Sequence, residues 1–332
     1  MKKLFILTSL VALALTGCGS NTSSQKTQTN PGDSAIDDPR FVFERNSLSI
    51  ITPTGAPALA FYDFATSPNF ETNDTPTNIV AMMVAGQKDV VVLPTNAGIQ
   101  AINGKSAPYK LAATITFGNF YVVSMGNDTN NVMDASDTIL LFQKNNVPDK
   151  IFHYVYGNSL DSAIHYVEAV SDASRAVISG SFVDADTGTN MTPNYVMIAE
   201  PALTNVKSKK DGLTVYANLQ EEYKNKANNK EIFQASVFVK NTLDTNTANA
   251  FLSTLEYDIT SALNDSNKLK EGMSKVESAA TVFGIAPEMA ETVLKNGNGM
   301  GLGYKYAKSN KAAIDTFLSL FNIPETNEEI YY

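Results

Sequence analysis

The chain has 332 residues, of which 43% are hydrophobic and 18% are charged, so neither a disordered chain nor a protein with many membrane spans is expected. At about 150 residues per domain, this length predicts two domains or one large domain. The formal net charge of -9 argues against a protein that coats nucleic acid through its summed field. The single cysteine, Cys18, excludes an intramolecular disulfide and a cysteine-based metal site.

Residues 1–17 have the layout of a secretory signal peptide. Two lysines precede an apolar run, residues 4–15, which is too short to span a bilayer as a helix. The segment Leu15-Thr16-Gly17-Cys18 resembles the lipobox of bacterial lipoproteins, in which the signal is removed before a cysteine that then carries the lipid. The resemblance implies lipidation of Cys18 and a lipid-anchored location on the extracytoplasmic face of the cell membrane. An ordinary secreted protein with a chance cysteine is the alternative.

Residues 18–45 are expected to form the lipidated cysteine and a flexible tether. Residues 19–38 are rich in Ser, Thr, Asn, Gln, Gly and Asp and have almost no apolar side chain to bury. The folded part is therefore expected to begin near residue 46 and to be attached to the membrane surface.

From the tether onward, strands and helices alternate. The expected elements are a strand over 47–52, a turn over 53–57, helices over 58–65 and 77–86, an apolar strand over 89–94, a helix beginning at Thr95 as a candidate N-cap, and strands over 111–116 and 120–124. The repetition of strand, loop and helix predicts an open α/β sheet.

The same alternation returns from residue 137, which predicts a second sheet. Strands are expected over 137–142, 163–169 and 195–201, with helices through 156, over 171–180 with a serine cap, and over 202–208. Strands over 213–217 and 235–240 are expected to return toward the first sheet, and the pattern from residue 246 is helical. The glycine-rich segment 297–303 follows a helix and is interpreted as an interhelix loop.

Several short motifs, in their order and spacing, resemble those of the solute-binding proteins of ABC importers. They are Pro53-Thr54-Gly55-Ala56-Pro57, Gln87-Lys88-Asp89-Val90-Val91-Val92 before Leu93-Pro94-Thr95-Asn96, Val147-Pro148-Asp149-Lys150, and Ala199-Glu200-Pro201. The resemblance covers about residues 46–325, and the most similar subgroup collects taurine, other alkanesulfonates, nitrate and thiamine-precursor pyrimidines. It implies an α/β, two-lobed periplasmic-binding-protein-like fold in which each lobe is a mainly parallel sheet flanked by helices. Two crossover strands join lobe 1 (46–122 and 235–332) to lobe 2 (123–234).

The function implied by this resemblance is that of a binding protein, not an enzyme. It would capture a small molecule between its lobes and deliver it to an ABC permease and its ATPase, as a monomer without cofactor, metal or nucleic acid. Neither His153 nor His165 has metal-ligand spacing, and no phosphate loop or nucleophile elbow is present in the sequence. An enzyme on the same fold, with lyase or cofactor-building chemistry, and a non-transport scaffold lipoprotein are the alternatives.

Ligands of open α/β sheets lie beyond the carboxyl ends of the strands, where the amino ends of helices point. The residues expected at these places are Thr54, Gly55, Ala56, Thr95, Asn96, Gln143, Asn145 and Glu200. Structural roles are the alternative for most of them. Thr95 and Asn96 can act as helix caps, Gln143 and Asn145 as surface loop residues, and Glu200 as a cap of the next helix.

The charges of these loops bear on the ligand. Apart from Lys144 and Lys150 they contain no cation, and they contain no Arg, so a multiply charged anion is disfavoured. One sulfonate can still be held by helix N-terminal amides. The aromatic residues near these loops, which can stack on a heterocycle or belong to the core, are Phe61, Tyr62, Phe117, Phe120, Tyr121 and Tyr195. The expected ligand is a small aromatic or heterocyclic compound or one of sulfonate type.

Overall fold

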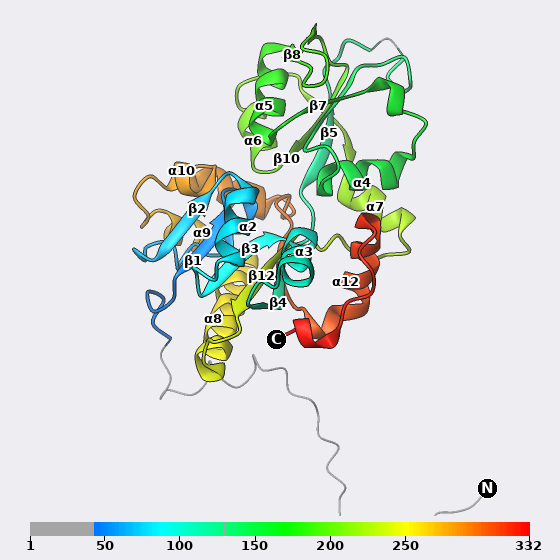
Figure 1. Cartoon of the computed structure of the whole chain (residues 1–332). Coiled ribbons are helices and arrows are strands. Elements are labelled where there is room, and N and C mark those ends of the chain that lie inside the picture. Colours follow the sequence, from blue (N-terminus) through cyan, green and yellow to red (C-terminus); the bar gives the residue numbers. More distant parts are fainter. Residues whose placement is uncertain (1–42, 129) are drawn as a thin grey trace, which may run out of the picture. The chain divides into compact units, whose positions relative to one another are not determined.

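The computed structural model describes residues 43–128 and 130–332, all of which belong to one compact unit of the chain, Pro31–Tyr332 (Figure 1). The predicted signal peptide, the lipidation site Cys18 and the predicted tether up to residue 42 lie outside the described residues. The last tether residues are packed on the folded part. The ring of Phe43 lies 6.1 Å from that of Phe64 and 6.0 Å from that of Phe251, measured between centroids.

The first sheet has six strands. Their order is β13 (Leu302–Tyr306), β4 (Tyr109–Thr116), β12 (Ala235–Lys240), β3 (Val90–Pro94), β1 (Ile50–Pro53) and β2 (Phe70–Asn73). β1 pairs in parallel with β2 and β3, whereas β12 runs antiparallel to β3 and β4, and β13 runs antiparallel to β4. The inner strands β3 and β12 are buried along nearly their whole length, as their continuous apolar sequences require.

The second sheet has five strands. Their order is β11 (Thr214–Asn218), β5 (Phe120–Ser124), β10 (Tyr195–Ala199), β6 (Ile139–Phe142) and β7 (Ile164–Val167). β10, β6 and β7 are mutually parallel, and β5 runs antiparallel to β10 and β11. A small hairpin of β8 (Phe182–Val183) and β9 (Asn190–Met191) occupies the segment between β7 and β10.

Two connections join the sheets. The chain leaves the first sheet through residues 117–119, between β4 and β5, and returns through residues 219–234, between β11 and β12. The expectation of an α/β fold with two sheets is confirmed. Most strands of each sheet run in one direction, as expected, but both sheets are mixed, because every pairing made by β4, β5 or β12 is antiparallel.

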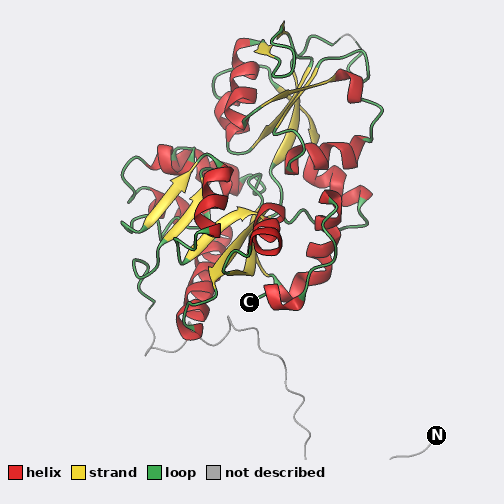
Figure 2. Cartoon of the chain, viewed as in Figure 1, coloured by secondary structure: helices red, strands yellow, loops and turns green. Residues whose placement is uncertain are grey.

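Helices flank both sheets (Figure 2). They are α1 (Ala56–Leu59), α2 (Pro76–Val84), α3 (Thr95–Lys105), α4 (Val147–Tyr156), α5 (Val170–Ser179), α6 (Ala202–Lys207), α7 (Leu219–Lys226), α8 (Thr245–Asn264), α9 (Ser266–Met273), α10 (Ala279–Phe283), α11 (Pro287–Lys295) and α12 (Lys311–Leu318). Short 3₁₀ turns occupy Asp161–Ala163, Lys308–Asn310, Ser319–Phe321 and Glu328–Ile330. None of the helices in the described part of the chain is both long and apolar enough to cross a membrane.

Two local predictions are wrong. The predicted serine cap of α5 is absent, because the helix begins at Val170 and the N–H of its N-cap residue, Ala169, donates to the carboxylate of Asp172 at 2.9 Å. The glycine-rich segment 297–303 does not join two helices. It connects α11 to β13, a strand that the helical reading of this region missed.

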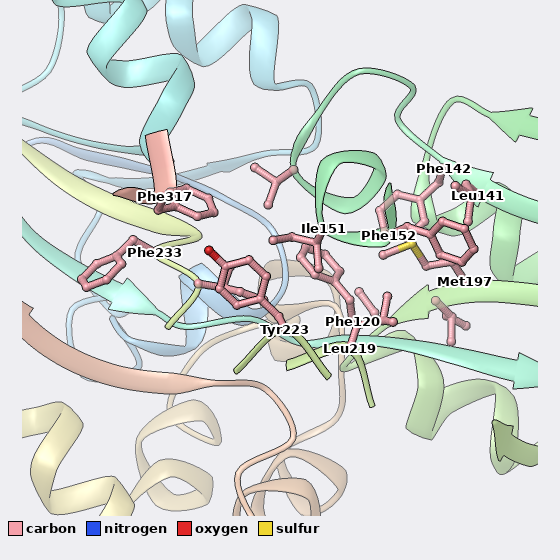
Figure 3. Packing of buried hydrophobic residues seen from close by; sticks show 14 of the residues in the cluster. Phe120, Leu141, Phe142, Ile151, Phe152, Met197, Leu219, Tyr223, Phe233 and Phe317 are labelled. Carbon is pink, nitrogen blue, oxygen red and sulfur yellow. The ribbon is translucent and has the colours of Figure 1, made fainter. Parts of the chain in front are cut away.

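The buried apolar side chains form two clusters. One lies on a single face of the first sheet, beneath α1 and α8. The other runs from the opposite face of the first sheet into the second sheet. Figure 3 shows part of it, including Phe120, Phe142, Phe152, Met197, Tyr223, Phe233 and Phe317. Continuous apolar packing through α4, α7 and α12 therefore connects the two sheets within this unit.

Candidate functional site

A cleft of about 590 Å³ lies where the carboxyl ends of parallel strands from both sheets meet. The first sheet contributes residues 53–57 after β1, Asp74 and Pro76 after β2, and Pro94 at the end of β3. The second sheet contributes residues that follow β6, β7 and β10, and both connections reach the cleft through Asn119 and Gln234. This size suits a small organic molecule.

The turn Thr54-Gly55-Ala56 forms one wall, as predicted for the end of β1. Gly55 has φ 98°, a conformation that residues with a side chain rarely adopt. A Cβ atom on Gly55 would lie 3.9 Å from the ring of Pro201, which belongs to the other wall. The two walls therefore approach each other closely here.

The loop after β6, residues 143–146, forms part of the opposite wall. Gln143 and Asn146 line the cleft, whereas Asn145 does not. The side chain of Asn146 accepts the N–H of Val147 at 2.9 Å and so caps α4. The ammonium group of Lys144 lies 2.8 Å from the carboxylate of Asp186 in the β8–β9 hairpin, and Lys144 is not among the lining residues.

Glu200, at the end of β10, lines the cleft and also caps the next helix. Its two carboxylate oxygens accept the N–H of Thr204 at 3.0 Å and the Thr204 hydroxyl at 2.8 Å. Burial raises the pKa of the Glu200 carboxyl, although the bonds to Thr204 and the charge of Lys207 act in the opposite direction. Glu200 is thus a buried acidic group at the cleft wall whose oxygens already have donors.

Thr95 and Asn96 do not line the cleft. The N-cap of α3 is Pro94, and Thr95 makes no capping hydrogen bond, so the cap interpretation of Thr95 is wrong. Its hydroxyl lies 2.7 Å from that of Ser236, which lies 2.8 Å from the hydroxyl of Thr114. β12 lies beside β3, so the hydroxyl of Thr95, directly after β3, bonds to a strand of the sheet and does not reach the cleft. Asn96, the next residue, is also buried, with 6% of its surface exposed, and so it too lies away from the cleft.

Two cationic side chains, those of Arg175 and Lys209, line the cleft. An inspection of the loops alone missed them, because they lie in α5 and just beyond α6. Arg175 is also ion-paired with Asp172. The signal that could have found them is helical spacing. The cleft-lining residues at and just beyond α5 and α6 recur at i, i+3, i+4 and i+7: Ser171, Ser174, Arg175 and Ile178, then Ala202, Asn205, Val206 and Lys209.

Two aromatic rings line the cleft, Phe120 and Phe142, and their centroids lie 6.3 Å apart. Phe120 was one of the predicted aromatic residues and Phe142 was not. Phe61, Tyr62 and Tyr195 are buried in the core and do not line the cleft. The aromatic contribution to the cleft is therefore smaller than the sequence suggested.

A second cavity, of about 620 Å³, lies between α5 and the β8–β9 hairpin. Its lining comes from β7, α5 and the hairpin segment only, and it shares Arg175 and Ile178 with the cleft. Because the cleft receives residues from both sheets and from both connections, the cleft is the candidate site.

No protein-family model matches this chain, and no curated protein matches it. Solved structures do. An ABC transporter protein from Parabacteroides distasonis is 18% identical, with TM-score 0.63, over 82% of this chain and 91% of that chain. The ligand-binding component of an ABC-type import system from Staphylococcus aureus, with zinc bound, is 10% identical, with TM-score 0.58, over 85% and 94%. The periplasmic aliphatic sulphonate binding protein SsuA from Escherichia coli is 11% identical, with TM-score 0.56, over 82% and 86%. The two-lobed periplasmic-binding-protein-like fold expected from the sequence is thereby confirmed.

Proposed function

We propose that this chain is an extracytoplasmic solute-binding lipoprotein, which captures a small molecule between its two lobes and delivers it to an ABC permease and its ATPase. The observation that carries the proposal is the cleft, because its walls come from both sheets and from the connections between them. A ligand that contacts both walls stabilises one closed arrangement of the lobes, which a permease can recognise. The binding proteins of the same fold described above support this role by analogy.

The proposed ligand is a small compound with an anionic group of sulfonate type and an apolar or aromatic body. Arg175 and Lys209 support the anionic group, and the hydroxyls of Ser171 and Ser174 add donors on the same wall. Phe120 and Phe142 support the apolar body. Asp74 and Glu200, which also line the cleft, disfavour a ligand with several negative charges.

The test is a thermal-shift titration of the mature protein with benzenesulfonate, methanesulfonate and the neutral analogue benzenesulfonamide. A ligand at a hundredfold excess over its dissociation constant adds about 2.7 kcal/mol to the unfolding free energy, so a sulfonate is expected to raise the melting temperature. Compaction in solution scattering should accompany binding. If none of these compounds nor a pyrimidine heterocycle raises the melting temperature, the scaffold alternative gains support.

Lys209→Met and Arg175→Met, made singly, are expected to weaken benzenesulfonate binding about tenfold, because each removes a charged hydrogen-bond donor to the sulfonate. Binding of benzenesulfonamide, where measurable, should change far less. Lys224→Met is the matched control, since this lysine is exposed on α7 and does not line the cleft. Isothermal titration calorimetry measures all three. Equal weakening by Lys224→Met would place the anion elsewhere.

Membrane attachment is proposed to depend on Cys18, which lies outside the described residues. Cys18→Ala is expected to release the chain into the soluble fraction or to leave its signal peptide uncleaved, because the variant has no thiol to carry the proposed lipid. Fractionation and incorporation of labelled palmitate measure this. A variant that is processed normally and still sediments with membranes would contradict the lipoprotein assignment.

An enzyme on this fold is the second candidate, and the raised pKa of Glu200 is the observation that favours it. Perturbed carboxyl groups in clefts are typical of acid–base catalysts. Incubation with a bound compound, followed by denaturation and mass spectrometry, separates the two functions. Recovery of the unchanged compound supports binding, and recovery of a product supports catalysis.

A further inference from the structure

The loop at residues 143–146 has an unusual backbone for a part of the cleft wall. Gln143 has φ 57° and Asn145 has φ 65°, which is the left-handed region that residues with a side chain seldom occupy. The same loop presents Gln143 and Asn146 to the cleft. A conformation of this kind persists only when surrounding contacts determine it.

Asp149 supplies the contacts that hold the loop. It lies in the first turn of α4 and is 4% exposed. One carboxylate oxygen accepts the N–H of Asn145 at 2.8 Å, and the other accepts the hydroxyl of Tyr166 at 2.7 Å. Nδ1 of His153 lies 3.0 Å from the same oxygen that accepts the Tyr166 hydroxyl. Asp149 therefore connects the loop to the strand β7.

Further contacts tie the loop to β7 and to the hairpin. The N–H of Gln143 donates to the carbonyl of Val167 at 3.0 Å. The ammonium of Lys144 lies 4.9 Å from the centre of the Tyr166 ring and is bonded to Asp186. The ammonium of Lys144 therefore contacts the face of the Tyr166 ring, and the Tyr166 hydroxyl donates to Asp149. None of these groups lines the cleft except Gln143.

We propose that Asp149 is a positioning residue for ligand binding: it holds the loop at 143–146 in the one conformation that presents Gln143 and Asn146 to the cleft. A carboxylate is suited to this role because its two oxygens accept from the loop and from Tyr166 at once. An amide of the same shape must turn its NH₂ group toward one of these two donors. The effect on binding, but not the effect on the loop, rests on the proposed solute-binding function.

The test compares Asp149→Asn with the wild type in two measurements. In the ligand-free protein, amide hydrogen exchange followed by NMR should be about tenfold or more faster at Asn145 and its neighbours, because the N–H loses a buried charged acceptor. Calorimetry with benzenesulfonate should show affinity about tenfold weaker, because the wall must be ordered when the ligand binds. Tyr166→Phe removes only one donor and should give a smaller change of the same sign in both measurements. If Asp149→Asn does not fold, Tyr166→Phe takes its place in both measurements.

Asp89→Asn is the matched control. One oxygen of the Asp89 carboxylate accepts both the N–H of Ser49, at 2.9 Å, and its hydroxyl, at 2.7 Å, so the amide oxygen of asparagine can keep both bonds. It lies before β3, at the end of the sheet opposite the cleft. This variant makes the same carboxylate-to-amide change away from the cleft, and should show wild-type exchange at 143–146 and wild-type affinity.

Three outcomes decide the proposal. Wild-type exchange at Asn145 in Asp149→Asn overturns it, whatever benzenesulfonate does. Faster exchange with unchanged benzenesulfonate affinity shows that the loop is held but does not position the ligand, and this also overturns it. If the wild type binds no benzenesulfonate, the proposed ligand class fails, and the exchange measurement alone decides whether Asp149 holds the loop.

Discussion

Arg45→Met is expected to lower the free energy of unfolding at pH 7 by about 1.4 kcal/mol, because without its cation the buried carboxyl of Asp258 must take up a proton to stay buried. Arg45 donates to both oxygens of Asp258 from Nη2, at 2.7 and 2.9 Å, and from Nε at 3.2 Å. The Asp258 side chain is 2% exposed. The guanidinium carbon also lies 5.5 Å from the centre of the Phe64 ring, and methionine places an unbranched apolar side chain there in its stead.

The loss should depend on pH with a predictable sign. Burial raises the pKa of Asp258 to about 6, even though Arg45 lowers it. Because the folded pKa lies above the unfolded value, the folded protein binds this proton more readily, and the group's contribution to stability falls as pH rises from about 4 to 6. Removing Arg45 raises the folded pKa further and extends this fall above pH 6. The difference between variant and wild type should therefore be small at pH 5 and large at pH 7.

Urea unfolding at the two pH values measures this difference. Lys275→Met is the control, since Lys275 lies 3.4 Å from Asp63 in the same region but is 63% exposed. An exposed pair of this kind contributes about 0.2 to 1 kcal/mol, with no comparable dependence on pH between 5 and 7. An Arg45→Met protein as stable as the wild type at pH 7, or one equally destabilised at both pH values, would show that Asp258 does not need the cation.

The sequence predicts the central strands well because strands buried on both faces appear as continuous apolar runs, as in Val90–Pro94 and Tyr195–Ala199. It does not predict β2, Phe70–Asn73, all of whose residues are at least partly exposed at the edge of the first sheet. The helix α7 escapes notice for a similar reason, since only Leu219 and Tyr223 of its residues are buried. Edge strands and polar helices leave weak hydrophobic patterns.

The candidate site is predictable where it depends on topology alone. The cleft lining includes Thr54, Gly55, Ala56, Gln143 and Glu200, all of which follow parallel strands. Thr95 also follows such a strand, but its hydroxyl is hydrogen-bonded to that of Ser236 in β12. This strand is an antiparallel neighbour of β3, and the sequence does not predict its position in the sheet. Helical spacing groups Arg175 with Ser171 and Lys209 with Asn205, but which helix face meets the cleft depends on the start and rotation of each helix, which one sequence does not determine.

The glycine-rich segment shows most clearly what tertiary contact adds. Gly301 has φ 61°, and a Cβ atom there would lie 2.0 Å from the carbonyl oxygen of Gly118, in the connection between the sheets. The N–H of Phe117 donates to the carbonyl of Gly301 at 2.8 Å, so the two backbones are already in contact. No pattern within residues 297–303 reveals this approach, because the partner lies far away in the sequence.

Gly301→Ala is therefore expected to lower the free energy of unfolding by about 3 kcal/mol or more, from the left-handed backbone and the overlap with Gly118 together. Gly297→Ala is the matched control in the same loop. Gly297 has φ 102°, but a Cβ there would meet nothing within 4 Å, so only the backbone strain of about 1 kcal/mol is expected. Urea unfolding measures both variants.

The same contact bears on the cleft. Because Phe117 and Gly118 directly precede Asn119 and Phe120, which line the cleft, Gly301→Ala should also alter ligand binding, whereas Gly297→Ala should not. Equal losses of stability in the two variants would mean that the connection can move away from Gly301 without cost, and that the close packing of this loop does not fix the cleft.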